Sequence, residues 1–397
     1  LFKREEPVNA EHKMGSSLQP LLHSGPAGAS KSSASFVIIA SLCSAALLFT
    51  LHLPSLHPAH SDNLLSVCEH GHDIKNPCRD IVSQLIPQMA KNDNLLQHLL
   101  RDSASRVTEL AHKVKLLTSF YNDARQVAAL ATCLDLMDLS IDRLTESANA
   151  LKLPGRESDA HTWLSAVLTN HVTCSDELTG AASTALISNL DDLILRARTI
   201  LAAFVDAHSP TRKIQTHGEY PSWLGRGDIK LLKLSAMDIV PDVVVAQDGT
   251  GNYRNITDAV AAAPTNRNTR YVIYVKKGTY YEQVLFGKSL KNIMIFGDGM
   301  NSTIISYNLS VDKGSTTFNS ATVAAVGDGF IAQDLCFKNT AGPENHQAVA
   351  LRLGSDKSVI NRCQIDAYQD TLYAHSNRQF YKGCNITGTV DFIFGNA

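Results

Sequence analysis

Two carboxylates near the end of the sequence stand at a spacing that suits a shared site. Asp370 lies in "YQDTLY" and Asp391 lies in "VDFIFG", 21 residues further on, while Gln347 and Gln369 are 22 residues apart. Two carboxylates at close range titrate as a pair, so one can stay protonated as an acid while the other acts as a nucleophile. Side-chain amides can donate hydrogen bonds to a developing oxyanion. Together these groups suit acyl transfer, in particular the hydrolysis of an ester.

The spacing brings these residues together only in a fold that repeats at the same interval. Residues 241–397 consist of short β-branched and aromatic runs, such as "RYVIYVKKGTYYEQV", "KNIMIFGDG" and "SVINRCQIDAY", cut by Gly, Asn and Asp turns. This pattern favours a right-handed parallel β-helix with coils of about 20–25 residues, and a β-sandwich is the competing fold. Residues one coil apart in a β-helix lie on neighbouring strands about 4.8 Å apart. The alternative interpretation is that both Asp residues are structural turn residues.

The local sequence also predicts which faces these side chains occupy. In "TVDFIFG", alternation places Val390, Phe392 and Phe394 on the core face and Asp391 on the outer face. Gln369 and Asp370 are neighbours, and a regular strand would send them to opposite faces. Both can therefore serve one site only if the chain bends between them.

The first half of the chain has a different character. From about residue 75 to residue 208, apolar residues recur at three- and four-residue spacing, which predicts an antiparallel helical bundle over residues 62–210. This region has 13 Lys and Arg against 19 Asp and Glu, whereas residues 241–397 have 14 against 13. Cys68 with Cys78, and Cys133 with Cys174, are plausible disulfide pairs. No catalytic or metal-binding cluster is apparent in the bundle, and the overall charge of −2 indicates no nucleic-acid partner.

The N-terminal region predicts entry into the secretory pathway. Residues 34–53 form an apolar run long enough to cross a membrane, and the basic residues of segment 1–33 favour a cytosolic N-terminus for it. A long cleaved signal peptide is the alternative to a signal-anchor. Four triplets fit the N-glycosylation sequon, at Asn255, Asn301, Asn308 and Asn385. Both the sequons and the paired cysteines fit an oxidising, extracellular environment.

The order of motifs resembles that of plant pectin methylesterases. The resemblance rests on "PDVVVAQDGTGNYRNITDAVAAAP", "TTFNSATVAAVGDGFIAQDLCFKNTAGPENHQAVALR", "CQIDAYQDTLYAHSNRQFYKGC" and "GTVDFIFGNA", and it runs through essentially all of residues 241–397. Residues 62–210 more loosely resemble the inhibitor-type pro-region of the same family. The resemblance implies a right-handed parallel β-helix, with neither a metal nor an organic cofactor.

The same resemblance implies a role for each candidate residue. Asp391 would be the nucleophile that attacks the methyl-ester carbonyl of galacturonate, and Asp370 would be the acid and then the base. Gln347 and Gln369 would stabilise the oxyanion, and Thr316 and Gln347 would contact the substrate. The implied partners are methyl-esterified pectin, the chain's own pro-region or separate pectin methylesterase inhibitors, and a subtilisin-like processing protease. The implied location is the cell wall, and a precursor that keeps its signal-anchor would be membrane-anchored.

The sequence departs from the family pattern in two places. It begins with Leu and stops at Ala397, before the later Arg and Trp that bind galacturonate in the family, so we expect a fragment with an incomplete β-helix. Cys384 would then lack a downstream partner, and Cys363 is the alternative. In the linker at residues 211–240 the basic processing motif is degenerate, and "IKLL" at residues 229–232 is its most recognisable remnant.

Two other functions compete with that of an esterase. The helical module could act as an inhibitor of other methylesterases, with a non-functional β-helix remnant attached. The β-helix could also belong to a pectate lyase, which needs an acidic calcium cluster, or to a polygalacturonase, which needs more carboxylates close together. Calcium-independent release of methanol would separate an esterase from both of these enzymes.

Overall fold

The computed structural model describes residues 64–70, 74–90, 94–208 and 216–397. The predicted segments 1–33 and 34–53 lie outside these residues. Within the described ranges, no helix combines the length and the apolar character that crossing a membrane requires. The described residues all belong to one compact unit.

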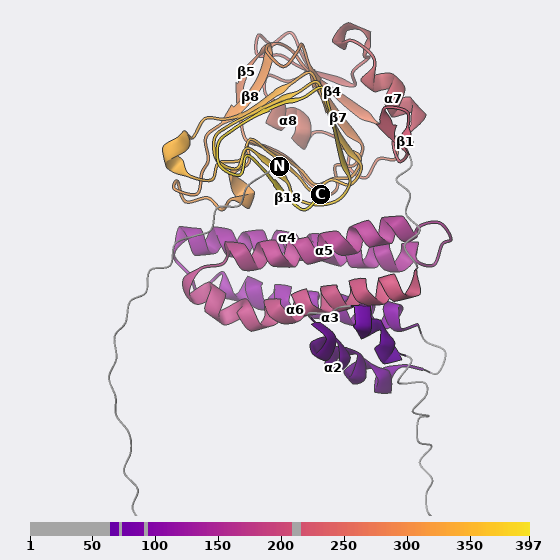
Figure 1. Cartoon of the computed structure of the whole chain (residues 1–397). Coiled ribbons are helices and arrows are strands. Elements are labelled where there is room, and N and C mark those ends of the chain that lie inside the picture. Colours follow the sequence, from indigo (N-terminus) through magenta and orange to yellow (C-terminus); the bar gives the residue numbers. More distant parts are fainter. Residues whose placement is uncertain (1–63, 71–73, 91–93, 209–215) are drawn as a thin grey trace, which may run out of the picture. The chain divides into compact units, whose positions relative to one another are not determined.

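The first part of this unit is the predicted helical bundle. Its elements are η1 (Ser66–His70), α2 (Lys75–Leu85), η3 (Ile86–Gln88), α3 (Leu95–Leu117), α4 (Ala124–Ala150), α5 (Glu157–Glu177) and α6 (Gly180–Ala207). In Figure 1, α4 lies beside α5 and α6 lies beside α3. Two helices begin at capping side chains, because Asn94 accepts a hydrogen bond from the backbone of Gln97, and Asp123 from that of Gln126.

The bundle core follows the apolar period of the helices. Four side chains of α4 lie three, four and seven residues apart and therefore share one helix face, and each is at most 1% exposed. They are Leu130, Cys133, Met137 and Leu144. Both predicted disulfides are present. The Cys133–Cys174 bond joins α4 to α5, and the Cys68–Cys78 bond joins η1 to α2.

The second part is a parallel β-helix, as predicted, and the β-sandwich alternative is wrong. Its strands form three parallel sheets, named sheets B, C and D. Sheet B consists of β3 (Val243–Val245), β4 (Tyr271–Val275), β7 (Ile293–Gly297), β10 (Ile331–Gln333), β13 (Ser358–Asn361) and β16 (Gln379–Lys382). Sheet C consists of β5 (Gly278–Tyr281), β8 (Thr303–Tyr307), β11 (Cys336–Asn339), β14 (Gln364–Asp366) and β17 (Asn385–Thr387). Sheet D consists of β6 (Val284–Phe286), β9 (Val323–Ala325), β12 (Leu351–Leu353), β15 (Leu372–Ala374) and β18 (Ile393–Gly395).

Three short helices lie within the β-helix, and the coils can be followed in Figure 1. The short helices are α8 (Ile256–Ala261), η5 (Phe318–Ser320) and η6 (Pro343–Asn345). Inward side chains stack in columns between the coils. One such column on sheet B takes one side chain from each of four neighbouring strands, and none of the four is exposed: Ile273, Ile295, Ala332 and Ile360. This stacking fixes the register between neighbouring coils.

The predicted face assignment in "TVDFIFG" is wrong for the aromatic residues. In the structure, Ile393 is opposite Leu372, whose side chain lies in the interior core. Phe394 therefore lies on the outer face of sheet D, where it stacks on Tyr373 with ring centroids 4.1 Å apart. Phe392 precedes the strand and is 37% exposed. The alternation fails because Asp391 adopts φ = 47°, so the strand begins only at Ile393.

The segment predicted to be a linker is largely folded. Residues 216–221 form a small antiparallel pair of strands, β1 (Thr216–His217) with β2 (Tyr220–Pro221), and these are followed by α7 (Arg226–Leu232) and η4 (Ala236–Asp238). Leu232, the last residue of "IKLL", is 1% exposed. The correction has a simple cause, because the apolar residues of this segment pack on the outer face of sheet B.

Candidate active site

The two candidate carboxylates lie in equivalent turns of neighbouring coils. The register pairs Leu372 with Ile393, which places Asp370 one coil from Asp391. Both residues have positive φ values, 65° and 47°, a region that Asp tolerates better than most side chains. The backbone N–H of Asp370 donates to the carbonyl of Val390 over 3.1 Å. The chain therefore bends before β15, which is the condition for Gln369 and Asp370 to serve one site.

The two glutamines come from the same stack of turns. The carbonyl of Gln369 accepts a hydrogen bond from the backbone of Ala348 over 3.2 Å, so the segments of Gln347 and Gln369 are adjacent. The carbonyl of Gln347 in turn accepts from the backbone of Val311 over 3.0 Å. Both glutamines are half-buried. The backbone segments that carry all four predicted residues thus adjoin one another in three neighbouring turns.

The environments of the two carboxylates differ. Asp370 is 7% exposed, whereas Asp391 is exposed. Burial, together with the negative charges of Asp391 and Glu177, raises the pKa of Asp370 to about 6. A carboxyl group that holds its proton at mildly acidic pH can donate it to a leaving group, and an exposed carboxylate can act as a nucleophile.

An outward-facing column on sheet D leads away from these acids. It consists of Leu285, Ala324, Arg352, Tyr373 and Phe394, one residue from each strand of the sheet. The Arg352 guanidinium lies 3.4 Å from the centroid of the Phe318 ring, and its Nε donates to the Phe318 carbonyl over 2.8 Å. Sequence reasoning missed Arg352, because in "ALRLG" an isolated Arg gives no signal of its place in a column formed by five coils.

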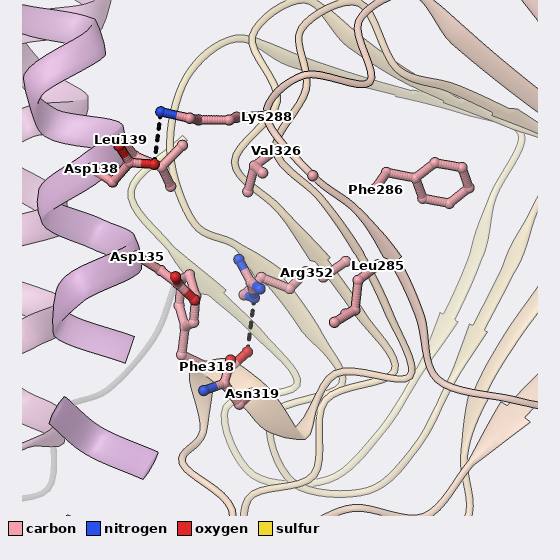
Figure 2. A pocket seen from close by; sticks show the side chains of 12 residues that line it. Asp135, Asp138, Leu139, Leu285, Phe286, Lys288, Phe318, Asn319, Val326 and Arg352 are labelled. Carbon is pink, nitrogen blue, oxygen red and sulfur yellow. Dashed lines mark hydrogen bonds and ion pairs between the residues drawn. The ribbon is translucent and has the colours of Figure 1, made fainter. Parts of the chain in front are cut away.

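Arg352 faces a cavity of about 220 Å³ that is lined by α4 and sheet D. Figure 2 shows Asp135 and Asp138 on the α4 side of this cavity and Arg352 and Lys288 on the other side. Nη1 of Arg352 is buried and has no hydrogen-bond partner among the described residues. Burial lowers the pKa of Arg352 to about 10, and burial also raises the pKa of Asp135. The column therefore presents a cationic group with an unused donor.

Side chains of the bundle contact the β-helix beside the candidate site. Glu177 of α5 accepts a hydrogen bond from the backbone of Phe318 over 2.8 Å. The hydroxyl groups of Thr132 and Thr316 are 3.3 Å apart. Thr316, a predicted substrate contact, is 3% exposed in this arrangement. The bundle therefore contacts Thr316, one of the two residues predicted to bind substrate.

A second group of contacts between bundle and β-helix consists of ion pairs and a hydrogen bond to a carboxylate. Arg143 of α4 pairs with both carboxylate oxygens of Asp328, with an Nη1–Oδ2 distance of 3.0 Å. The indole N–H of Trp163 donates to Asp356 over 3.0 Å. Asp159 of α5 pairs with Arg378 at 2.7 Å. Buried pairs of this kind are costly to break, because each leaves a partner without its counter-charge.

The remaining predicted sites have mixed surroundings. Among the four sequons, Asn301, Asn308 and Asn385 are exposed, while Asn255 caps α8 and its amide donates to Asp258 over 2.7 Å. Glycosylation at all four remains a prediction. Cys336, Cys363 and Cys384 are free thiols among the described residues, so Cys363, the alternative partner, is not bonded to Cys384. In the same part of the chain, no group of three or more His, Cys, Asp or Glu side chains is arranged to hold a metal ion.

The raised pKa of Asp370 predicts that ionisation of this carboxyl group lowers the free energy of unfolding as pH rises. Because its pKa rises from 3.8 to about 6 on folding, the folded state binds more protons than the unfolded state between pH 4 and 6. Stability is therefore lost as pH rises through this window. We expect Asp370→Asn to raise the free energy of unfolding at pH 7 by about 2–3 kcal/mol, and to change it little at pH 4. Urea unfolding at the two pH values measures this difference.

Asp366→Asn is the matched control for that measurement. Asp366 lies four residues earlier on the same coil, and although burial acts to raise its pKa, hydrogen bonds from Lys338 and Thr387 lower it overall. The sign is therefore opposite, and Asp366→Asn should reduce stability at pH 7. If Asp370→Asn also destabilises the protein at pH 7, the carboxyl group of Asp370 is not held at a raised pKa.

Comparison with known proteins identifies both parts of the chain. Residues 242–397 match the family model "Pectinesterase", and residues 62–200 match "Plant invertase/pectin methylesterase inhibitor". Among solved structures, pectin methylesterase from carrot is 62% identical, with a TM-score of 0.40, and the match covers 40% of this chain and 50% of that one.

Curated relatives match across both parts. Pectinesterase 2.1 of Solanum lycopersicum is 49% identical over 84% of this chain and 62% of its own length. The pectinesterase/pectinesterase inhibitor of Ficus pumila var. awkeotsang is 49% identical over 81% of this chain and 61% of its own length. The chain thus spans about three fifths of these relatives. Pectinesterase/pectinesterase inhibitor 18 of Arabidopsis thaliana is 43% identical over 97% of this chain and 72% of its own length. The chain therefore belongs to the pectinesterase/pectinesterase inhibitor family.

Proposed function

We propose that this chain carries the catalytic centre of a pectin methylesterase, which hydrolyses methyl esters of cell-wall homogalacturonan and releases methanol. The observation that carries the proposal is the pair of turns one coil apart, in which a buried carboxyl group with a pKa near 6 lies beside an exposed carboxylate. Membership of the family supports the same reaction.

In the proposed reaction, a carboxylate oxygen of Asp391 attacks the methyl-ester carbonyl carbon. The side-chain amides of Gln347 and Gln369 donate hydrogen bonds to the oxyanion that forms. The C–O bond to methanol then breaks as Asp370 transfers its proton to the leaving oxygen, which leaves an acyl-enzyme on Asp391. Asp370, now a carboxylate, takes a proton from water, and the resulting hydroxide attacks the acyl carbon. The acyl bond to Asp391 breaks, which restores the Asp391 carboxylate and leaves Asp370 protonated. The released galacturonic acid group then loses its proton to solvent.

The bundle would restrain this reaction by occupying the substrate surface. Glu177 approaches Asp370 closely enough to raise its pKa, and Thr132 contacts Thr316. The column of Arg352, Tyr373 and Phe394 would then bind the galacturonate chain once the bundle has left. Arg352 suits this role because uronate carboxylates are anionic and its Nη1 donor is unused among the described residues.

Partners and location follow from the same proposal. The partners are methyl-esterified pectin, the chain's own bundle or separate inhibitors of the same class, and a subtilisin-like protease that separates bundle from β-helix. The location is the cell wall, reached through the secretory pathway, and the sequons and the two bundle disulfides are compatible with that route.

The test is a methanol assay on the complete gene product, meaning the chain as far as its transcript encodes it. We expect methanol release from methyl-esterified homogalacturonan, unchanged by a calcium chelator and without the formation of unsaturated uronate ends. Unesterified polygalacturonate is the control substrate and should give no methanol. Absence of methanol, together with inhibition of an added pectin methylesterase, would instead favour the inhibitor-like binding function that the inhibitor-type domain also suggests.

A further inference from the structure

The outer face of sheet B carries a continuous apolar stripe. The stripe consists of Val272, Met294, Ile331, Val359 and Phe380, which occupy matching positions on five neighbouring strands. These side chains lie on the opposite strand face from core residues such as Ile295. The first four are nevertheless at most 8% exposed. Something other than the interior of the β-helix must therefore cover them.

The cover is residues 219–239, which we call the strap. Four apolar side chains of the strap pack on the stripe: Tyr220, Leu224, Leu232 and Ile239, each at most 6% exposed. Met237, on the same segment, is 94% exposed and takes no part in this packing. The strap thus buries some of its apolar side chains against sheet B and leaves others in solvent, as a peptide bound to a protein surface does.

Polar groups of the β-helix hold the strap by its backbone at the "IKLL" motif. The carbonyl of Leu232 accepts hydrogen bonds from Asn361 over 3.0 Å and from Arg362 over 2.9 Å. The same guanidinium donates to the carbonyl of Leu234 over 3.2 Å. Asp334 holds Arg362 in place through two hydrogen bonds of 2.7 Å. The backbone immediately around residues 232–234 is therefore bound to the β-helix on both sides of the bond after Lys233.

Ion pairs fix the strap at two further points. Asp228 of α7 pairs with Arg270 beside β4, with an Nη2–Oδ2 distance of 2.8 Å. Glu219 pairs with Lys382 of β16, whose ammonium group also lies 4.7 Å from the centroid of the Tyr220 ring. The β-helix residues that bind the strap thus come from sheet B strands or from the turns that adjoin them.

We propose that the strap is a part of the β-helix domain and that its docking on sheet B protects the degenerate processing motif from proteases. A protease binds its target as an extended peptide, and the bonds after Lys230 and Lys233 lie in or directly after α7. Cleavage there requires α7 to unwind and Leu232 to leave sheet B, so its rate is set by release of the strap. A subtilisin-like protease therefore cannot separate bundle from β-helix at residues 229–233 while the strap is docked. This inference does not depend on the proposed esterase activity.

The experiment is limited trypsin digestion of the folded chain, with mass spectrometry of the products that end at Lys230 and Lys233. Leu232→Asp places a charge in the apolar contact, and Met237→Asp is the matched exchange at an exposed position of the same strap. We expect cleavage at the two lysines to be at least about tenfold faster in Leu232→Asp than in the wild-type chain. Met237→Asp should match the wild-type rate.

A second variant keeps the test decisive if Leu232→Asp does not fold. Arg362→Gln leaves the apolar contacts intact but removes the guanidinium donors to the two strap carbonyls, and it should accelerate cleavage to a smaller extent. Urea-unfolded wild-type chain gives the intrinsic rate at the same bonds. The proposal is overturned if the folded wild-type chain is cut at Lys230 or Lys233 as fast as the unfolded chain. It is also overturned if a folded Arg362→Gln variant is cut no faster than the wild type.

Discussion

Replacing Asp391 by Asn in the complete gene product is expected to lower methanol release from methyl-esterified pectin by at least about 10³-fold. An amide is a much weaker nucleophile than a carboxylate, so formation of the acyl-enzyme would cease. The turn itself should survive, because Asn tolerates the positive φ of 47° as well as Asp does. Methanol release under single-turnover and steady-state conditions measures the loss.

The control for Asp391→Asn must separate lost chemistry from lost structure. Asp366 lies on β14 of sheet C, outside the candidate site, and Asp366→Asn removes a carboxylate that pairs with Lys338 at 2.8 Å. It should retain turnover while reducing stability. If Asp391→Asn keeps a substantial part of the wild-type rate with unchanged circular dichroism, Asp391 is not the nucleophile.

The coil spacing was predictable where the coils are regular. Val359 and Phe380 pair at an interval of 21 residues, as do Leu372 and Ile393, and this is the spacing that placed Asp370 near Asp391. Earlier coils depart from it, because 37 residues separate Met294 from its partner Ile331. Long turns, such as the one between β8 and β9 that carries Thr316, lengthen a coil although its strands stay short. Spacing therefore predicts proximity only after the turn lengths are known.

Other features depend on contacts that no local pattern encodes. The outward position of Phe394 follows from the positive φ of Asp391, which shifts the alternation of the strand by one residue. Glu177 has no motif, and its place beside Phe318 follows from how the bundle packs on the β-helix. The strap looked like a linker because its apolar residues are spaced irregularly, to fit a surface contributed by five strands. In each case the missing information is the tertiary partner.

Charge reversal at Arg143 is expected to release the bundle from the candidate site. The Arg143 side chain is 8% exposed and pairs with Asp328, so Arg143→Glu would bury two like charges face to face. Breaking a buried pair costs about 3–5 kcal/mol, which corresponds to a shift of about 10²–10³ in the docking equilibrium. We expect hydrogen exchange at the Phe318 N–H, which donates to Glu177, to accelerate by a similar factor. Methanol release should rise in parallel.

Two further variants test whether Arg143→Glu acts by weakening the docking of the bundle on the β-helix. Arg198→Glu reverses an exposed charge on α6 and should leave exchange at Phe318 unaltered. Arg143→Glu combined with Asp328→Arg restores opposite charges across the contact and should recover much of the protection. Unchanged exchange at Phe318 in Arg143→Glu, with the bundle still helical, would mean that the Arg143–Asp328 pair does not hold the bundle over the carboxylates. Accelerated exchange without added turnover would instead separate docking from inhibition, because the candidate site would then be uncovered and still inactive.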